Sequence, residues 1–294
     1  MNVADGVGLL RSEKFEARER ALLESGRESV GDMRDRYQRD GYVVVRSLFD
    51  RATVRAMAMV SDALREAPDS VHGAWKYYDD GASRPFAAAH MGGDAPPSSR
   101  LRSERIIQRV ERFRDSAPVF GRVFDDPALT RIVTALLGDR PVLFKEKLNY
   151  KPCGGSALAP HQDMQAGWAR YAPRLTSAYI AIDAATRANG CMEVAVGAHQ
   201  HGLLGAPWEP LSGAALSQLT FQPIELDAGD VAFFDAYTPH RAGANTTPYD
   251  RRALLATYNR ASDGDHYQQY FADKFAALPP HCAREPGRAY AFHV

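Results

Sequence analysis

The spacing of hydrophobic positions changes near residue 141 of the chain. Before this point, residues 42–49 are rich in β-branched side chains and predict a short strand. Apolar residues recur at helical spacing over 51–67, 105–113 and 127–138, which predicts three helices. The last of these stretches closes with a glycine, the residue that commonly ends a helix.

After residue 141 the pattern becomes a series of short runs rich in β-forming residues and separated by turn residues. A final helix is expected over 263–281, stopped by Pro279 and Pro280. The order of elements predicts a mainly β fold with flanking helices, an antiparallel barrel or jelly roll. The expected strands lie in the runs PVLFKEKLNYKP, LTSAYIAIDAAT, CMEVAVGAH, LTFQPIEL, DVAFFDAY and RRALLATYN.

Two segments lack periodicity. Residues 1–35 are polar and dense in Arg and Glu, and we expect a helical or mobile arm outside the core. Residues 70–100 are rich in Gly, Pro, Ser and Asp and are expected to form a long loop that covers a site and selects its ligand. The remainder, 36–294, is expected to be a single domain.

Charge and cysteine content exclude several classes of protein. The 294 residues contain 36 Lys and Arg against 36 Asp and Glu, so no basic field favours nucleic acid as a partner. No run approaches the ~20 apolar residues of a membrane span, and the N-terminal residues carry charges where a secretory signal needs an apolar run. Three widely spaced cysteines suit reduced thiols, so we expect a cytoplasmic protein. Separately, we expect a small molecule as its partner.

The candidate chemistry centres on the sequence His161-Gln162-Asp163. Residues two apart on a strand point to the same side, so His161 and Asp163 are expected to face a barrel interior together. His240 follows 79 residues after His161, near the end of another expected strand. Two imidazoles and one carboxylate cover one face of an octahedral metal, as in non-haem Fe(II) oxygenases. An isolated HxD sequence has little specificity, so further residues are needed.

Arg251 supplies the second feature. If AGANTTPYD connects two antiparallel strands, the return strand brings Arg251 back beside the end that carries His240. Its guanidinium fork could hold the far carboxylate of a dicarboxylic keto acid whose other end chelates iron. The neighbouring Arg252 is expected to point to the opposite face, and a solvent-exposed arginine is the alternative interpretation of Arg251.

The strand before HQD alternates polar and apolar residues. Lys145, Lys147, Asn149 and Lys151 are expected on one face. Such a face normally meets solvent. If it looks into the barrel instead, an anionic cosubstrate offsets part of the cost of burying its charge. Trp168, seven residues after His161, is expected either to wall the site or to pack in the core.

Together, HQD at 161–163, the distant His240, Arg251 and the segment DAATRANGCMEVAVGAHQHG (183–202) resemble the phytanoyl-CoA dioxygenase family over roughly 35–280. The resemblance implies a double-stranded β-helix and an oxygenase that uses Fe(II), 2-oxoglutarate and O2. It implies His161, Asp163 and His240 as the iron ligands, and Arg251 as the anchor of the 2-oxoglutarate C5 carboxylate.

The resemblance also bears on the polar strand and on the reaction. It implies contacts of Lys151 with 2-oxoglutarate and of Lys145 with the prime substrate, and we group Asn149 with the former and Lys147 with the latter. Related ectoine hydroxylases have a tryptophan one residue before Trp168. A carboxylate ligand such as Asp163 disfavours halogenation, so hydroxylation with release of succinate and CO2 is the default outcome. Desaturation, cyclisation or epimerisation would use the same residues.

Other functions and the substrate stay open. A zinc hydrolase could use the same three ligands, although it has no need of the arginine and the lysines. A non-catalytic binding barrel is the other alternative. The runs FKEKLNYKP and HYQQYFADKFAALPP resemble bacterial members that hydroxylate small zwitterions such as 2-aminoethylphosphonate, but PCGGSALAPHQDMQAGW differs from them. We therefore expect a small polar metabolite or natural-product intermediate as substrate, and the oligomeric state is not predicted.

Overall fold

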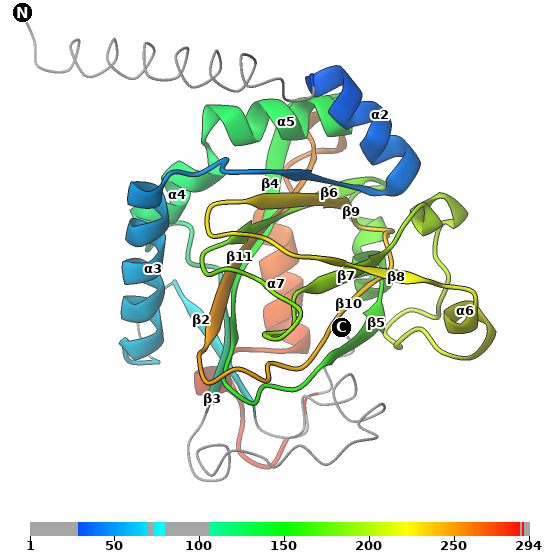
Figure 1. Ribbon diagram of the computed structural model, residues 1–294. Helices are drawn as coiled ribbons and strands as arrows, with labels where there is room; N and C mark the ends of the chain where they lie inside the picture. Colours follow the sequence, from blue (N-terminus) through cyan, green and yellow to red (C-terminus); the bar gives the residue numbers. More distant parts are fainter. Residues whose placement is uncertain (1–28, 70–72, 80–105, 289, 291–294) are drawn as a thin grey trace, which may run out of the picture.

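Two antiparallel sheets form the framework of the protein (Figure 1). The computed structural model describes residues 29–69, 73–79, 106–288 and 290. The large sheet contains β1 (Tyr42–Val45), β2 (Trp75–Asp79), β3 (Ile106–Glu111), β4 (Pro141–Lys151), β6 (Leu175–Ala181), β9 (Val231–Asp235) and β11 (Arg251–Arg260). The small sheet contains β5 (Leu158–His161), β7 (Met192–Ala195), β8 (Phe221–Ile224) and β10 (His240–Ala242). Their strand orders are β1-β9-β6-β11-β4-β3-β2 and β5-β10-β7-β8.

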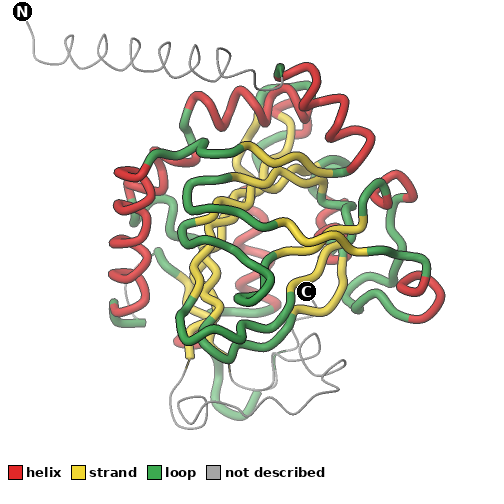
Figure 2. The backbone as a smooth tube through the Cα atoms, in the orientation of Figure 1, coloured by secondary structure: helices red, strands yellow, loops and turns green. Residues whose placement is uncertain are grey.

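Helices lie along the outside of the strands (Figure 2). Near the N-terminal end of the described chain, α2 packs against α5, and α5 contacts β4, β6 and β11 of the large sheet. No helix among the described residues is both long and apolar enough to cross a membrane. The helices are α2 (Val30–Asp40), α3 (Arg51–Glu66), α4 (Pro118–Phe124), α5 (Pro127–Leu137), α6 (Gly213–Ser217) and α7 (Tyr267–Ala277).

The large sheet buries both of its faces. One face joins the helices in the main core, which includes Phe144, Leu148 and Leu254. The other face of the sheet meets the small sheet in a second apolar cluster. That cluster contains Tyr179, Ala181, Ala232, Phe234, Ala253 and Leu255 from the large sheet, and Met192, Val194 and Ile224 from the small one. The two sheets therefore face each other.

Strand β4 lies in the interior although it carries four charged side chains and one amide. Its even-numbered side chains Phe144, Leu148 and Tyr150 are buried in the main core, as alternation along a strand requires. From Lys145 to Lys151 the odd-numbered side chains point to the opposite face, between the two sheets, whereas a bulge between Lys145 and Leu143 places Leu143 in the main core. The polar face of the strand is therefore inside the molecule and not against solvent.

Glu146 is the exception on the core side of β4. Its Oε1 accepts hydrogen bonds from the backbone N–H groups of Phe113 and Arg114 and from the hydroxyl of Tyr267. Its Oε2 is buried without a hydrogen-bond partner. Burial raises the pKa of Glu146 to about 7, although the three hydrogen bonds act in the opposite direction.

This raised pKa predicts a pH-dependent stability. The folded state holds the Glu146 proton more tightly than the unfolded state, so stability falls as pH rises between the ordinary pKa of 4.5 and about 7. At 1.36 kcal/mol per pKa unit, the loss is on the order of 3 kcal/mol. Glu146→Gln keeps an acceptor for the three donors and cannot ionise. Urea unfolding at pH 5 and pH 8 should therefore show a smaller decrease for the variant, and an equal decrease in both proteins would contradict the assignment.

Most elements expected from the sequence are confirmed. The strand at 42–49 is β1, and the helices at 51–67 and 127–138 are α3 and α5. Each of the six β-forming runs after residue 141 contains a strand, and the last expected helix is α7, which ends before Pro279. The short strands β5 and β10 lie outside these six runs.

Two expectations for the first part of the chain are wrong. Residues 105–113, expected as a helix, contain strand β3. Gln108 has no partner on β2, because Tyr77 pairs with Arg109 and Tyr78 with Ile107. This bulge shifts the alternation of side chains and gives the apolar residues a helix-like spacing.

The expected loop at 70–100 contains strand β2 at 75–79. The remainder of this stretch, 70–72 and 80–100, lies outside the described residues, and so does the expectation that it covers a site. Residues 1–28 of the expected N-terminal arm also lie outside, whereas residues from 30 onward belong to α2.

Candidate metal centre and cosubstrate site

The two histidines meet across a strand pair of the small sheet. His161 is the last residue of β5 and His240 the first residue of β10, and the two are direct partners in the ladder. Their ring centroids lie 4.2 Å apart. Each ring has its Nδ1 near a backbone carbonyl, 2.9 Å from Ala159 O and 3.0 Å from Thr238 O. Since a carbonyl only accepts, Nδ1 carries the proton and the lone pair is on Nε2, the form that binds a metal.

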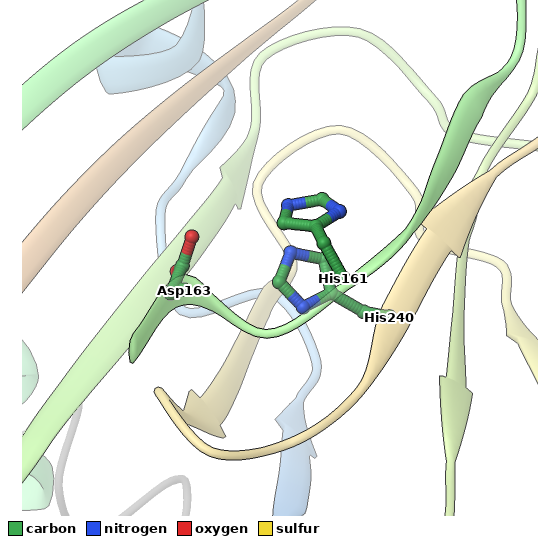
Figure 3. Close-up of side chains that lie close together, drawn as sticks. All are labelled: His161, Asp163 and His240. Atoms are coloured by element: carbon green, nitrogen blue, oxygen red, sulfur yellow. The ribbon is translucent and has the colours of Figure 1, made fainter. Parts of the chain in front are cut away.

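Asp163 completes the cluster, although β5 ends before it. The expected strand through residues 161–163 is replaced at Asp163 by a short 3₁₀ helix of residues 163–166. The ligand atoms of His161, Asp163 and His240 nevertheless all lie within 4.8 Å of one another (Figure 3). The hydroxyl of Ser177 on β6 donates to Asp163 Oδ2 at 3.3 Å. The sequence therefore predicted the convergence correctly and the local backbone incorrectly.

The electrostatics of the cluster fit a divalent cation. Burial lowers the pKa of His161 to about 3 and that of His240 below its usual value, so both rings are neutral. Burial raises the pKa of Asp163, but its electrostatic interactions with His240, Lys147, His161 and Lys145 outweigh burial, and the net pKa is lowered. Two neutral imidazoles and one carboxylate, all buried, form the donor set of a facial triad with open positions for other ligands.

Gln162 fixes the two strands that carry the cluster. Its Nε2 donates to the carbonyls of Gly202 and Tyr237 at 2.7 and 2.6 Å, and its Oε1 accepts from Leu204 N at 2.7 Å. Tyr237 lies three residues before His240, so one buried amide links the HQD segment to the turn that leads into β10. Gln162 was not predicted as a functional residue, although its position between His161 and Asp163 could have indicated a supporting role.

Arg251 is delivered to the same cavity by a strand pairing that differs from the expected one. Strand β10 pairs with β5 and β7, whereas β11 pairs with β4 and β6, so the two do not form a hairpin. Arg251 instead lies directly opposite Lys151 of β4. Arg251 and His240 both line a cavity of about 300 Å³ between the sheets. The expected location near His240 holds, but the expected hairpin is wrong.

The guanidinium of Arg251 is buried and lacks a counterion among the described residues. Its Nη1 donates to the hydroxyl of Tyr179 and its Nη2 to the carbonyl of Gly190 at 3.0 Å. Its Nε is buried without a hydrogen-bond partner. Burial lowers the pKa of Arg251 to about 10. A buried cation held by neutral groups, whose Nε nitrogen has no partner, fits the carboxylate of a bound keto diacid.

Two backbone carbonyls hold the cations at this end of the cavity. Lys151 Nζ donates to Gly243 O, and burial together with the charge of Arg251 lowers the pKa of this lysine to about 7. Gly190 has a φ of 72°, and a Cβ on it would lie 2.2 Å from Gly243 O. Only glycine allows the two loops to approach so closely, and their carbonyls then face the two cations.

Arg252 points to the opposite face of β11, as expected. Its guanidinium forms ion pairs with Asp183 at 2.8 Å and with Asp62 of α3 at 2.9 Å. These contacts attach the strand to the helical layer. Arg252 is therefore a structural residue, and Arg251 is the one of the two adjacent arginines that lines the cavity.

The four polar residues of β4 all line the cavity, so the inward-facing alternative is the one that the structure adopts. Burial lowers the pKa of Lys147 to about 8 and lowers that of Lys145 as well. Trp168 combines both of the roles considered for it. It packs against Phe144 of the core, with ring centroids 5.4 Å apart, and it also lines the cavity.

Several cavity residues were missed by sequence reasoning. Arg109 and Glu111 lie on β3, opposite Asn149 and Lys147 of β4. They were missed because their segment was expected to be a helix. Tyr179 of β6 and Tyr270 of α7 also line the cavity, and no local pattern marks them in the sequence.

Facing antiparallel sheets around a buried His-Asp-His cluster, with a buried arginine in the same cavity, define a non-haem iron oxygenase of the double-stranded β-helix class. The chain belongs to the phytanoyl-CoA dioxygenase family, whose model matches residues 37–253. Membership confirms the expected enzyme class, an iron oxygenase that uses 2-oxoglutarate.

Curated relatives support the same class. The chain is 34% identical over 189 residues to "2-aminoethylphosphonate dioxygenase" from an uncultured bacterium, HF130_AEPn_1, covering 64% of this chain and 72% of that protein. It is 38% identical over 141 residues to "Methylphosphonate hydroxylase" from Gimesia maris, covering 48% of this chain and 54% of that protein. The chain thus spans only about half the length of the second relative.

Solved structures confirm the double-stranded β-helix fold. EctD from S. alaskensis, solved with 2-oxoglutarate and 5-hydroxyectoine, matches with a TM-score of 0.62 at 21% identity, covering 78% of this chain and 75% of that one. The epimerase SnoN from nogalamycin biosynthesis, solved with Fe3+, alpha ketoglutarate and nogalamycin RO, has a TM-score of 0.62 at 20% identity, covering 89% and 94%.

Proposed function

We propose that the chain is an Fe(II)- and 2-oxoglutarate-dependent dioxygenase that hydroxylates a C–H bond of a small polar metabolite or natural-product intermediate. His161, Asp163 and His240 hold the iron, and Arg251 with Lys151 and Asn149 holds 2-oxoglutarate. Lys145, Lys147 and Trp168 face the prime substrate. The observation that carries the proposal is one cavity lined by both a three-ligand cluster within 4.8 Å and a buried arginine without a counterion.

The residues of the chain bind, orient and exclude water. With iron and O2 bound, the site supplies oxidative decarboxylation of 2-oxoglutarate to succinate and CO2, coupled to oxidation of the substrate. The fork of Arg251 grips the C5 carboxylate and so fixes the distance of the keto acid from the His-Asp-His cluster. Phe234 and Trp168 provide rigid apolar walls that limit access of water.

The relatives bear on substrate and outcome. Two are named for small phosphonates, which fits a cavity of about 300 Å³ lined with cations. Among proteins of the same fold are an epimerase, SnoN, and a carbocyclase, SnoK, so the fold accommodates outcomes other than hydroxylation. We also propose a cytoplasmic location, because Cys153, Cys191 and Cys282 are all free thiols.

A zinc hydrolase is the second candidate, because Zn²⁺ accepts the same three ligands. We expect the purified protein to consume O2 and 2-oxoglutarate and to form succinate with Fe(II), and not with Zn²⁺. A metabolite library screened for stimulated succinate formation then identifies the substrate. Hydrolysis supported by Zn²⁺ under anaerobic conditions would favour the hydrolase, and binding of iron and 2-oxoglutarate without any turnover would favour a non-catalytic barrel.

A further inference from the structure

Basic side chains outnumber acidic ones along the cavity. Among the described residues that line it, six are basic and two are acidic. The basic residues are Arg109, Lys145, Lys147, Lys151, Arg241 and Arg251, and the acidic ones are Glu111 and Asp163. Arg241 forms an ion pair with Glu193, and bound iron and the dianion 2-oxoglutarate would cancel each other in charge, so an excess of positive charge remains.

Both carboxylates already have partners. Asp163 belongs to the metal cluster. Glu111 is buried and forms ion pairs with Lys274 of α7 and with Arg109, the latter at 2.9 Å. The charges of Lys274, Lys145 and Arg109 together hold the pKa of Glu111 well below its usual range despite its burial. Both acids act on the two lysines through space, Glu111 most strongly on Lys145 and Asp163 most strongly on Lys147, but neither acid forms an ion pair with either lysine.

Lys145 and Lys147 make no hydrogen bond or ion pair with any described residue. Lys145 is only 4% exposed, and its Nζ lies 5.0 Å from the ring centroid of Trp168 and 5.2 Å from that of Tyr270. Cation–π contacts of this kind recover only part of the cost of removing an ammonium group from water. The two lysines thus lie in the cavity without an oxygen acceptor among the described residues.

The other described lysines differ from Lys145 and Lys147 in their hydrogen bonding. The sequence contains only six lysines among its 36 basic residues. Lys76 donates to the carbonyls of Arg65 and Ala67, Lys151 to a carbonyl, and Lys274 to a carboxylate. Each of these buried or half-buried lysines has an oxygen acceptor in the protein. Lys145 and Lys147 are the two described lysines without an oxygen acceptor among the described residues.

These two lysines are separate from the cosubstrate anchor. Residues of one face of a strand follow at about 6.7 Å, so Lys145 and Lys151 lie about 20 Å apart along β4. Lys151 faces Arg251, whereas Lys145 faces Trp168 and Tyr270. Lys147 lies between them and influences Asp163. A second anion can therefore bind at the Lys145 end while 2-oxoglutarate occupies the Arg251 end.

We propose that Lys145 and Lys147 bind an anionic head group of the prime substrate, a phosphonate or a carboxylate, which Trp168 and Tyr270 enclose. The inference rests on the proposed function, because it assigns the other end of the cavity to 2-oxoglutarate. It restricts the substrate to a molecule whose reacting carbon lies a short distance from its anion, since Lys147 is next to the metal cluster. Neutral substrates are excluded.

The test is calorimetric titration of anaerobic protein saturated with Fe(II) and 2-oxoglutarate. Ethylphosphonate, propanoate and 1-propanol share an ethyl group and differ in the head group. We expect binding of one or both anions and at least about tenfold weaker binding of 1-propanol, because a charge-assisted contact is lost. The comparison of the two anions identifies the head group. Equal affinity for all three compounds, or no binding of either anion, would overturn the proposal.

Variants separate this site from the other functions of the protein. Lys145→Met and Lys147→Met should each weaken binding of the preferred anion about tenfold or more and leave the affinity for 2-oxoglutarate unchanged. Lys76→Met is the matched control, a buried lysine away from the cavity, and should retain anion binding. A loss of 2-oxoglutarate affinity in the Lys145 and Lys147 variants would assign both lysines to the cosubstrate.

The proposal and the proposed function can fail independently. If the protein forms succinate from 2-oxoglutarate but anions bind no better than 1-propanol, the head-group site is wrong and the oxygenase assignment stands. If no succinate forms under any condition, the oxygenase assignment fails whatever the titrations show.

Discussion

Replacement of His161 or Asp163 with alanine is expected to lower iron-dependent turnover by more than about 100-fold in a protein that remains folded. Changes to residues that merely support metal ligands already cost 10- to 100-fold, so the loss of a ligand should cost more. Both side chains are buried beside the cavity and take little part in the apolar core. Iron retained after gel filtration, succinate formation and melting temperature should be measured together.

The control for this prediction is His201→Ala. His201 is an exposed histidine in the 3₁₀ turn of residues 198–201 and is not part of the metal cluster. We expect this variant to retain iron and full turnover. Full activity in either His161→Ala or Asp163→Ala would be incompatible with the assigned iron site, and a large decrease in melting temperature would show a structural role instead.

The convergence of the metal cluster was predictable because it depends on few local details. His161 and His240 lie on strands that pair directly, and Asp163 is so close in sequence to His161 that a strand or a 3₁₀ turn brings it to the same place. The incorrect prediction of the backbone after His161 therefore did not affect the predicted position of Asp163. Short strands such as β5 and β10 carry too few residues for a periodicity to emerge.

The substrate side of the cavity was harder to predict, because it depends on irregular pairing. A single unpaired residue, Gln108, changes the side-chain alternation of β3. The apolar residues of this segment then have a helix-like spacing. For this reason Arg109 and Glu111 were not predicted as residues of the site. Arg251 was identified by its residue type and distance from His240, whereas its actual position follows from pairing with β4 across the large sheet. Non-local strand order cannot be inferred from spacing within one segment.

Arg251→Ala is expected to weaken 2-oxoglutarate binding by roughly ten- to 150-fold, the equivalent of ~1.5 to 3 kcal/mol for a charge-assisted hydrogen bond. The guanidinium is the buried cation at this end of the cavity with an unused donor, so alanine removes the group that the C5 carboxylate needs. Titration of the anaerobic Fe(II) protein with 2-oxoglutarate measures the effect directly. Succinate, which keeps one carboxylate at the same end, should lose affinity in parallel.

Arg252→Ala is the matched control, because the two arginines are adjacent on β11 and point to opposite faces. Arg252 joins the strand to Asp183 and Asp62 through ion pairs, so its loss should lower the melting temperature. The folded Arg252→Ala protein should bind 2-oxoglutarate as tightly as the wild type. If Arg251→Ala retains wild-type affinity, the C5 carboxylate binds elsewhere, and Lys151, its partner across the strand pair, becomes the next residue to test.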